Sequence, residues 1–295
     1  MSGDQPNQPV DPAEGDDSVE ATPATPRDAG AAGGVPAGVP ADELAPEGPA
    51  EGPAEEPAPE VRILHLDDDF VAVSKPSGLL VHRDEHHPDA PAALQLVRDL
   101  VGRYVYPFHR LDRATSGILL FGFSSDAAAK LQKSLSSPDA HKEYAALMRF
   151  PGSNRELGEK WTCDRPLADD KGIARDSRTD FELLEAFDRC ALVQCRIYTG
   201  RYHQIRRHAN HSGRHILGDT THGKGRINAL CRERFGLHRL FLHLGRVQMS
   251  HPISGERLLV EDPMPQELLD VLDSLRQQPP KSPPSDPTSD PIAQP

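Results

Sequence analysis

The stretch HRLDRATSG at residues 109–117 sets one carboxylate, Asp112, between Arg110 and Arg113. An arginine close to a carboxylate favours the charged form of that carboxylate. An ionised and oriented carboxylate can attack an electrophilic carbon, as glycosidases do at a sugar. The alternative is an aspartate that caps a turn and pairs with a neighbouring arginine. These nine residues alone leave both interpretations open.

A second group of charged side chains lies in the segment TGRYHQIRRHANHSGRHILGDTTHG. On a helix, Arg206 would follow Arg201 by five residues, and His208 would follow His203 in the same way. Two basic stripes could then face a phosphate backbone or a carboxylate together. The alternatives are a solvated basic helix and a metal site formed by the histidines. The histidine spacing matches neither HExxH nor a zinc finger, which disfavours the metal site.

Tyr144 is the third candidate and lies in HKEYAA, within a predicted strand. A tyrosine in a strand is commonly a half-buried packing residue. Its ring can also stack on a nucleic-acid base, and its hydroxyl group is available for proton transfer. The position in the strand is compatible with both interpretations.

Composition divides the 295-residue chain into three parts. Residues 1–60 hold twelve prolines and fourteen acidic residues against the single Arg27, with no aromatic residue. Such a segment cannot bury enough apolar surface to offset its ordering entropy, so we expect a disordered acidic tail. Residues 279–295 are rich in proline and are expected to be disordered as well. The sequence therefore predicts one folded domain over residues 61–278.

Charge is distributed unevenly along the chain, whose formal net charge is −12. The acidic residues concentrate in the first tail, so the predicted folded domain is slightly basic. Residues 196–251 contain eleven Lys/Arg against Asp219 and Glu233. Such a patch suits a polyanion such as RNA, with a solvated basic face as the alternative.

Features of membrane and secreted proteins are not found in the sequence. We find no apolar signal region at the N-terminus and no run of 18 apolar residues, so we expect no membrane segment. The four cysteines form no CxxC pair. We therefore expect reduced cysteines in a cytoplasmic protein, without a disulfide framework or a structural zinc site.

The predicted elements favour an α+β domain built on a mostly antiparallel sheet, because strands follow strands and helices are interspersed irregularly. Strands are predicted within residues 61–82 and at 116–123, 141–150, 179–187, 190–198 and 239–251. Helices are predicted at residues 91–104, 124–137, 201–213 and 265–277, and a serine is expected to cap the start of the second.

Several long motifs resemble those of the RluA family of RNA pseudouridine synthases. These are HRLDRATSGILLFG, KEYAA, TGRYHQIRRHANHSGRHILGD and RLFLHL, in this order, with KPSGLLVH resembling the opening strand and turn of the family. The resemblance implies the pseudouridine synthase fold, with a mixed, mainly antiparallel sheet in two lobes and a central RNA-binding cleft. It also implies that a uridine is flipped out of structured RNA and isomerised to pseudouridine, with no cofactor and no metal.

The resemblance further implies roles for individual residues. Asp112 matches the catalytic aspartate, which acts on the target nucleoside by attack at C1′ or by a glycal route. Tyr144 matches the tyrosine that stacks on the uracil and serves proton transfer at C5, and Arg206 matches the arginine that pairs with the aspartate. Arg110 matches the arginine that fills the gap left by the flipped uridine. Other substrate-binding residues are expected at His109, Arg201, His203, Gln204, Arg207 and Leu242.

Departures from the general family pattern point to a subgroup. The pattern GDxxYG reads GDTTHG here, with His222 where tyrosine is common. The following segment KGRINALCRERFGLHRLFLH, and HRDEHHPD near residue 85, resemble the subgroup acting on a tRNA stem uridine, the tRNA pseudouridine synthases C. Leu244 stands where a small residue is usual, which concerns local packing.

We therefore expect a monomeric cytoplasmic enzyme that modifies tRNA, with ribosomal RNA as the alternative substrate. An RNA-binding or RNA-folding module without catalytic activity is the alternative from another class. A metal-dependent hydrolase built on the histidines is a third hypothesis.

Overall fold

The computed structural model describes residues 60–83, 85, 87–150 and 159–278. Its contacts divide the chain near residue 56, and every described residue belongs to the second of the two units. Apart from residue 60, both predicted tails lie outside the described residues. The disorder expected for the tails therefore stays a prediction.

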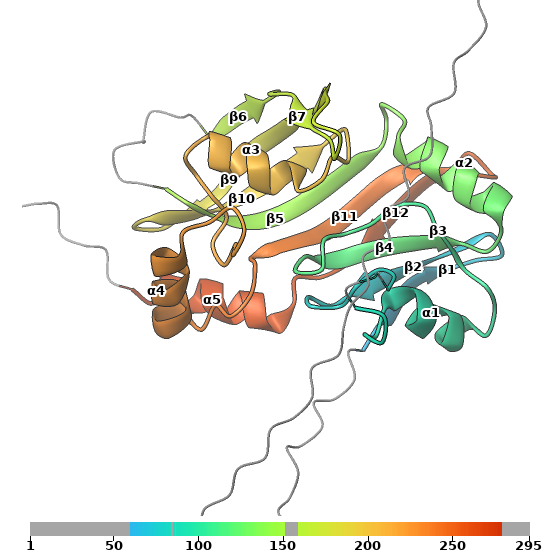
Figure 1. Ribbon diagram of the computed structural model, residues 1–295, viewed down its shortest axis with the longest axis horizontal. Helices are drawn as coiled ribbons and strands as arrows, with labels where there is room; N and C mark the ends of the chain where they lie inside the picture. The colour runs from blue at the N-terminus through green and yellow to red at the C-terminus, as the bar shows by residue number, and fades with distance from the viewer. Residues whose placement is uncertain (1–59, 84, 86, 151–158, 279–295) are drawn as a thin grey trace, which may run out of the picture. The chain divides into compact units, whose positions relative to one another are not determined.

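A ten-stranded sheet forms the centre of the described unit (Figure 1). Its strands follow the order β1-β2-β4-β11-β5-β10-β9-β6, with β12 beside β11 and β3 beside β4. The pairing of β11 with β4 is parallel and the other pairings in this sheet are antiparallel, which confirms the predicted mixed, mainly antiparallel sheet. The strands are β1 Arg62–Leu66, β2 Phe70–Lys75, β3 Tyr106–Pro107, β4 Ser116–Gly122, β5 His141–Arg149, β6 Lys160–Cys163, β9 Thr179–Ala186, β10 Cys190–Ile197, β11 Leu242–Ser250 and β12 Arg257–Glu261, with a separate pair formed by β7 Leu167–Ala168 and β8 Ala174–Arg175.

Five helices accompany the sheet within the described residues (Figure 1). They are α1 Ala93–Val101, α2 Ser125–Leu135, α3 Gln204–His211, α4 Gly225–Phe235 and α5 Gln266–Arg276. The predicted cap of α2 is confirmed, because the side chain of Ser124 accepts a hydrogen bond from the amide of Ala127. Helix α4 was not predicted, since it buries only Asn228 and Cys231 and so has little apolar periodicity.

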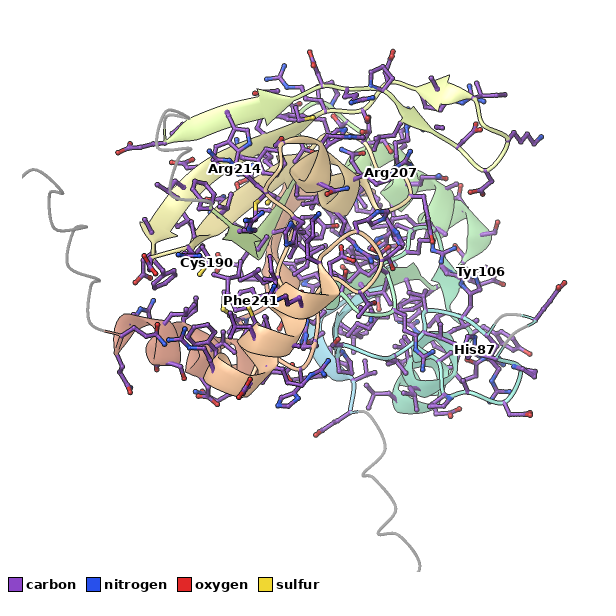
Figure 2. All side chains as sticks on the ribbon, turned by 60° about the vertical axis from the view of Figure 1, so that its left-hand side comes forward. His87, Tyr106, Cys190, Arg207, Arg214 and Phe241 are labelled. Atoms are coloured by element: carbon purple, nitrogen blue, oxygen red, sulfur yellow. The ribbon has the colours of Figure 1, made fainter. Side chains whose placement is uncertain are left out.

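Hydrophobic clusters explain where the helices pack. Helix α1 covers the β2 and β4 half of the sheet through Ala93 and Val97, both fully buried. Helices α4 and α5 share a second cluster, and Figure 2 shows Cys190 and Phe241 of this cluster beside them. The largest cluster runs along the middle strands and includes Tyr144. Helices α1, α4 and α5 therefore pack against the sheet through the first two of these clusters.

The parallel pair of β4 and β11 approaches closely at Gly117, just after the turn that carries Asp112. Gly117 has a φ of +123°, and a Cβ atom there would lie 2.3 Å from the carbonyl oxygen of Leu244. Only glycine fits both constraints. Leu244 itself is buried in the main cluster, so the larger side chain at this position packs into the core.

Candidate functional site

The turn that carries Asp112 is fixed by the KPSG turn at the end of β2. Ser77 Oγ donates to the carbonyl oxygen of Ala114 at 2.8 Å, and the amide of Gly78 donates to the carbonyl oxygen of Arg113 at 2.8 Å. In return, Arg113 Nε donates to the carbonyl oxygen of Gly78 at 2.9 Å. Asp112 is thus held at the entrance of a buried strand, where a reacting group can be oriented well.

Lys75 reinforces this turn from inside the protein. Its fully buried Nζ donates to the carbonyl oxygens of Pro76 at 2.9 Å, Leu79 at 2.8 Å and Arg113 at 3.2 Å. Burial, together with the nearby charge of Arg239, lowers the pKa of Lys75 to about 7. Sequence reasoning did not name Lys75 as a site residue, although its place in the KPSG motif was a usable signal.

Arg206 joins two carboxylates from inside the site. Its Nη1 donates to Asp112 Oδ2 at 3.1 Å. Its Nε and Nη2 each donate to a carboxylate oxygen of Asp219 at 2.8 Å, in a bidentate pair. Asp219 Oδ1 also accepts the amides of Thr221 and His222 at 2.9 Å. Arg206 is therefore anchored on one side and presents one donor to Asp112 on the other.

The ion pair between Arg206 and Asp219 favours the charged form of both side chains. Burial alone would raise the pKa of Asp219, but hydrogen bonds from Arg206 and from the amides of His222 and Thr221 hold that pKa below its usual range. Burial would lower the pKa of Arg206, and its contacts with Asp219 and Asp112 raise the pKa instead. Sequence reasoning did not assign a role to Asp219, which the GD dipeptide of the motif marked.

His203 also lies close to Asp112, immediately before α3. Its Nε2 is 3.7 Å from Asp112 Oδ2, and its Nδ1 is 3.0 Å from Nε2 of His222. The ring of Tyr202 stacks on that of His203 with 3.8 Å between centroids. His203 has a φ of +50°, a left-handed conformation that costs a residue with a Cβ atom about 1–2 kcal/mol.

Tyr144 lies in β5 and is nearly buried, with 8% of its surface exposed. Burial and the negative charge of Asp112 raise its pKa above the usual range for tyrosine. The hydroxyl group of Tyr144 therefore stays protonated near neutral pH. Tyr144 therefore packs in the main hydrophobic cluster and also lies close enough to Asp112 to feel its charge.

The structure places the remaining predicted residues in different surroundings. Arg110 is exposed two residues before Asp112. His109 Nε2 accepts the amide of Leu120 at 2.9 Å, and burial lowers the pKa of His109 to about 3. Leu242 is buried in β11 within the main cluster. Arg110 is thus the one fully exposed residue of these three, while His109 is partly exposed.

The predicted helix over residues 201–213 begins later than expected, at Gln204. The buried side chain of Gln204 accepts hydrogen bonds from Thr199 Oγ1 at 2.7 Å and from the amide of Arg201 at 3.1 Å, which holds the preceding loop in a turn. Arg201 Nε donates to the carbonyl oxygen of Asp176 outside the helix. Arg207 Nη1 donates to the carbonyl oxygen of Ala168 at 3.0 Å.

The prediction of two basic stripes on this helix is wrong. Arg201 and His203 precede the helix, so they cannot share a helical face with Arg206 and His208. His208 also points inward, with Nδ1 2.9 Å from Oγ1 of Thr179. The helix therefore presents Arg206 to Asp112 without forming a basic face of that kind.

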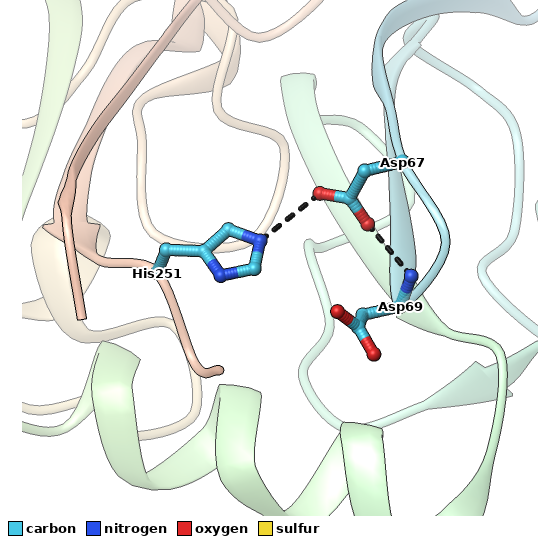
Figure 3. Close-up of side chains that lie close together, drawn as sticks. All are labelled: Asp67, Asp69 and His251. Carbon is cyan, nitrogen blue, oxygen red and sulfur yellow. Dashed lines mark hydrogen bonds and ion pairs between the residues drawn. The ribbon is translucent and has the colours of Figure 1, made fainter. Parts of the chain in front are cut away.

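Within the described residues, one group of three side chains has the spacing of metal ligands: Asp67, Asp69 and His251 (Figure 3). The carboxylate of Asp67 is already occupied. Its Oδ2 contacts Nε2 of His65 at 2.7 Å and Nε2 of His251 at 3.1 Å. Its Oδ1 accepts the amides of Asp69 at 2.8 Å and Phe70 at 2.9 Å. The group ties the turn before β2 to the turn after β11, and these contacts indicate a structural role.

We predict that Asp67→Ala lowers the free energy of unfolding by about 1–3 kcal/mol at pH 7, because several hydrogen bonds to one carboxylate are lost. Burial raises the pKa of Asp67, but its hydrogen bonds outweigh this effect and hold the pKa below 3.8. The contribution of Asp67 is therefore present above that pH and is lost as the pH falls further. Urea unfolding at pH 7 and pH 3 measures the difference, with the exposed neighbour Asp68→Ala as the control. An equal deficit at both pH values would contradict this prediction.

Two further observations bear on the predicted class of protein. The four cysteines are free, as expected. In the described part of the chain, none of the helices has the length and apolar character needed to cross a membrane.

Comparisons with known proteins agree with these features. The pattern of the RNA pseudouridylate synthase family matches residues 69–211, which include Asp112, Tyr144 and Arg206. The tRNA pseudouridine synthase C of Vibrio parahaemolyticus is 35% identical over 228 residues, covering 68% of this chain and 89% of the relative. That of Salmonella typhi is 33% identical over 235 residues, covering 72% and 88%. Among solved structures, human RNA Pseudouridylate Synthase Domain Containing 4 has a TM-score of 0.60 at 22% identity, covering 74% of this chain and 94% of the human chain, which shows a shared fold.

Proposed function

The chain belongs to the RNA pseudouridylate synthase family, and from this premise we propose that it isomerises one specific uridine in a tRNA stem to pseudouridine. The relatives named above are tRNA pseudouridine synthases C, which favours tRNA over ribosomal RNA. The observation that carries the proposal is the buried Arg206, which holds Asp112 at the surface end of an ion-pair chain. A structural ion pair would have no need to leave Asp112 partly accessible.

In this proposal Asp112 is the group that acts on the ribose. Its side chain is 22% exposed, while those of its partners Arg206 and Asp219 are 6% and 0% exposed. The carboxylate can therefore meet a nucleoside while its position is fixed from behind. Arg206 stabilises the charged carboxylate before the reaction, and the breaking C1′–N1 bond leaves the uracil free to turn and rejoin through C5.

Tyr144 and Arg110 serve the extruded nucleotide and the gap that it leaves. The ring of Tyr144 stacks on the uracil. Arg110 is exposed beside the catalytic turn, and its long cationic side chain can enter the RNA helix at the vacated position. Arg110 lies two residues before Asp112, so the arginine that fills the gap and the reacting carboxylate approach the same nucleotide.

The RNA backbone is bound by basic side chains around α4. Lys224, Arg226, Arg232 and Arg234 are exposed on or beside this helix. Phosphate neutralisation by such residues releases counterions and makes binding depend steeply on salt. The described arginines Arg206 and Arg239 are engaged in carboxylate contacts and do not belong to this surface.

The proposed reaction rearranges bonds within one nucleoside without a change in redox state. It needs no cofactor and no metal, and one copy of the chain supplies all of the named residues. We place the enzyme in the cytoplasm as a monomer, in keeping with its free cysteines.

Pseudouridine mapping on unmodified transcripts tests the proposal. Purified tRNAs and ribosomal RNA fragments are offered separately, with a chelator present, and each product is located at its nucleotide. We expect product at one stem uridine of a tRNA. Product only on ribosomal RNA would contradict tRNA as the substrate. Binding without product on either RNA would favour a non-catalytic RNA-binding protein. Loss of product on chelation alone would favour a metal-dependent enzyme.

A further inference from the structure

His203 and His222 form an imidazole pair beside Asp112. Nδ1 of His203 and Nε2 of His222 lie 3.0 Å apart and share a hydrogen bond. The second nitrogen of His203, Nε2, is 3.7 Å from Asp112 Oδ2, which is too long for a direct hydrogen bond. One end of the pair is therefore open beside the reacting carboxylate, and the other end leads to the half-buried His222.

The orientation of His203 is imposed by the local backbone. Among the described residues it is the one non-glycine residue with a positive φ. Such a conformation is unfavourable for a residue with a Cβ atom and is retained where the surroundings require it. The ring of Tyr202, itself 58% exposed, stacks on the outer side of the His203 ring. The ring is thus held against Asp112 by the backbone, by Tyr202 and by His222.

The isomerisation requires a base near the ribose, because the hydrogen on C5 must leave as a proton. Tyr144 is poorly suited, since burial and the charge of Asp112 raise its pKa. Burial lowers the pKa of His203, and the charges of Arg206 and His222 act in the same direction against those of Asp112 and Asp219. His203 is therefore neutral near pH 7, and one of its ring nitrogens carries no proton. When Nδ1 donates to His222, the unprotonated nitrogen is Nε2, on the side of Asp112.

We propose that His203 Nε2 is the base that removes the C5 proton and that His222 passes this proton on toward solvent. The inference rests on the proposed function and deepens it by assigning the proton transfer. His203 is the catalytic residue of the pair, and His222 acts through it.

The isomerisation removes one proton from the uracil ring at C5 and adds one at N1. The C1′–C5 bond forms, and the electron pair of the C5–H bond restores the C5=C6 double bond as His203 Nε2 takes the proton. The proton on His203 Nδ1 moves to His222 Nε2, and the proton on His222 Nδ1 moves to water. N1 leaves C1′ as an anion and takes one proton from water. The reaction therefore consumes no net proton and needs no co-reactant.

Tritium release from tRNA transcripts labelled with [5-³H]uridine measures the C5 proton transfer directly. His203→Gly removes the ring and keeps a residue that adopts the left-handed backbone, so the fold is preserved. We expect single-turnover release to fall about 100-fold, because a general base contributes on this scale. Added imidazole is expected to restore release at least about tenfold by replacing the missing base. RNA affinity in filter binding is expected to fall much less than release, because His203 is one of several expected substrate-binding residues.

Two more variants complete the test. His222→Phe keeps a ring of similar size without the relay nitrogen and is expected to slow release about tenfold. His211→Ala, at an exposed histidine at the end of α3, is expected to behave like the wild type. Release by His203→Gly within threefold of the wild type, or a loss that imidazole does not restore, overturns the base assignment. Wild-type release by His222→Phe overturns the relay. A wild-type enzyme that releases no tritium from any RNA overturns the proposed function itself.

Discussion

Asp112→Asn is expected to reduce pseudouridine formation by about 10⁴-fold or more, as removal of a catalytic nucleophile does in other enzymes. Asparagine has nearly the same shape, and its Oδ1 can still accept the hydrogen bond from Arg206 Nη1. The turn is held by backbone contacts that do not involve the carboxylate. The substitution therefore removes the charge and nucleophilicity while the geometry remains.

Single-turnover product formation and RNA binding, measured on the same preparations, check this prediction. RNA affinity and the melting temperature are expected to match the wild type. Asp139→Asn makes the same chemical change at an exposed aspartate and serves as the control. Activity of Asp112→Asn within about tenfold of the wild type would contradict a catalytic role of the carboxylate, because a nucleophile contributes far more than that.

Local features of the fold were well predicted from the sequence. The run SGILLFG is completely buried and forms β4, and the serine before α2 caps that helix. These outcomes depend on residues close together in the chain, where apolar runs and capping side chains act directly. Helix α4 and strand β12 were missed because they bury few side chains, so their sequences carry no clear apolar pattern.

The residues next to Asp112 in the sequence did not predict its ionic partner. Arg113 turns back to the carbonyl oxygen of Gly78, and Arg110 is exposed. The observed partner, Arg206, lies 94 residues further along the chain and was indicated by the family resemblance alone. A contact at such separation depends on how β4 and α3 are brought together, which a local pattern does not encode.

The supporting residues of the site show the same limit. Lys75 acts through three backbone carbonyl oxygens, and a sequence does not reveal which carbonyl groups will converge. Asp219 accepts a hydrogen bond from Arg206, and His222 forms one with His203. Their motifs were visible in the sequence, but their partners were defined by the tertiary structure.

Arg206→Gln is expected to lower both activity and stability. Without the guanidinium group, Asp112 loses its donor, and we expect activity to fall about 100-fold or more, as when one electrostatic contact to the reacting centre is removed. The buried carboxylate of Asp219 also loses its bidentate partner, which costs about 3–5 kcal/mol. Arg207→Gln, at the next position of the same helix and without a carboxylate contact of this kind, is expected to change the free energy of unfolding by less than about 1 kcal/mol.

The pH dependence of stability and a second substitution separate the loss of activity in Arg206→Gln from its loss of stability. In this variant only the amides of Thr221 and His222 still oppose the effect of burial on Asp219, so its pKa rises relative to the wild type. Its carboxyl group therefore becomes neutral at a higher pH, and the stability deficit shrinks toward acid pH. Adding Asp219→Asn removes the unpaired charge and leaves an oxygen for the amides of Thr221 and His222. The double variant should therefore regain most of the lost stability, measured by urea unfolding. Its activity should remain low, because Asp112 still lacks the donor that Arg206 supplied. Recovery of activity together with stability would show that Arg206 serves the fold alone.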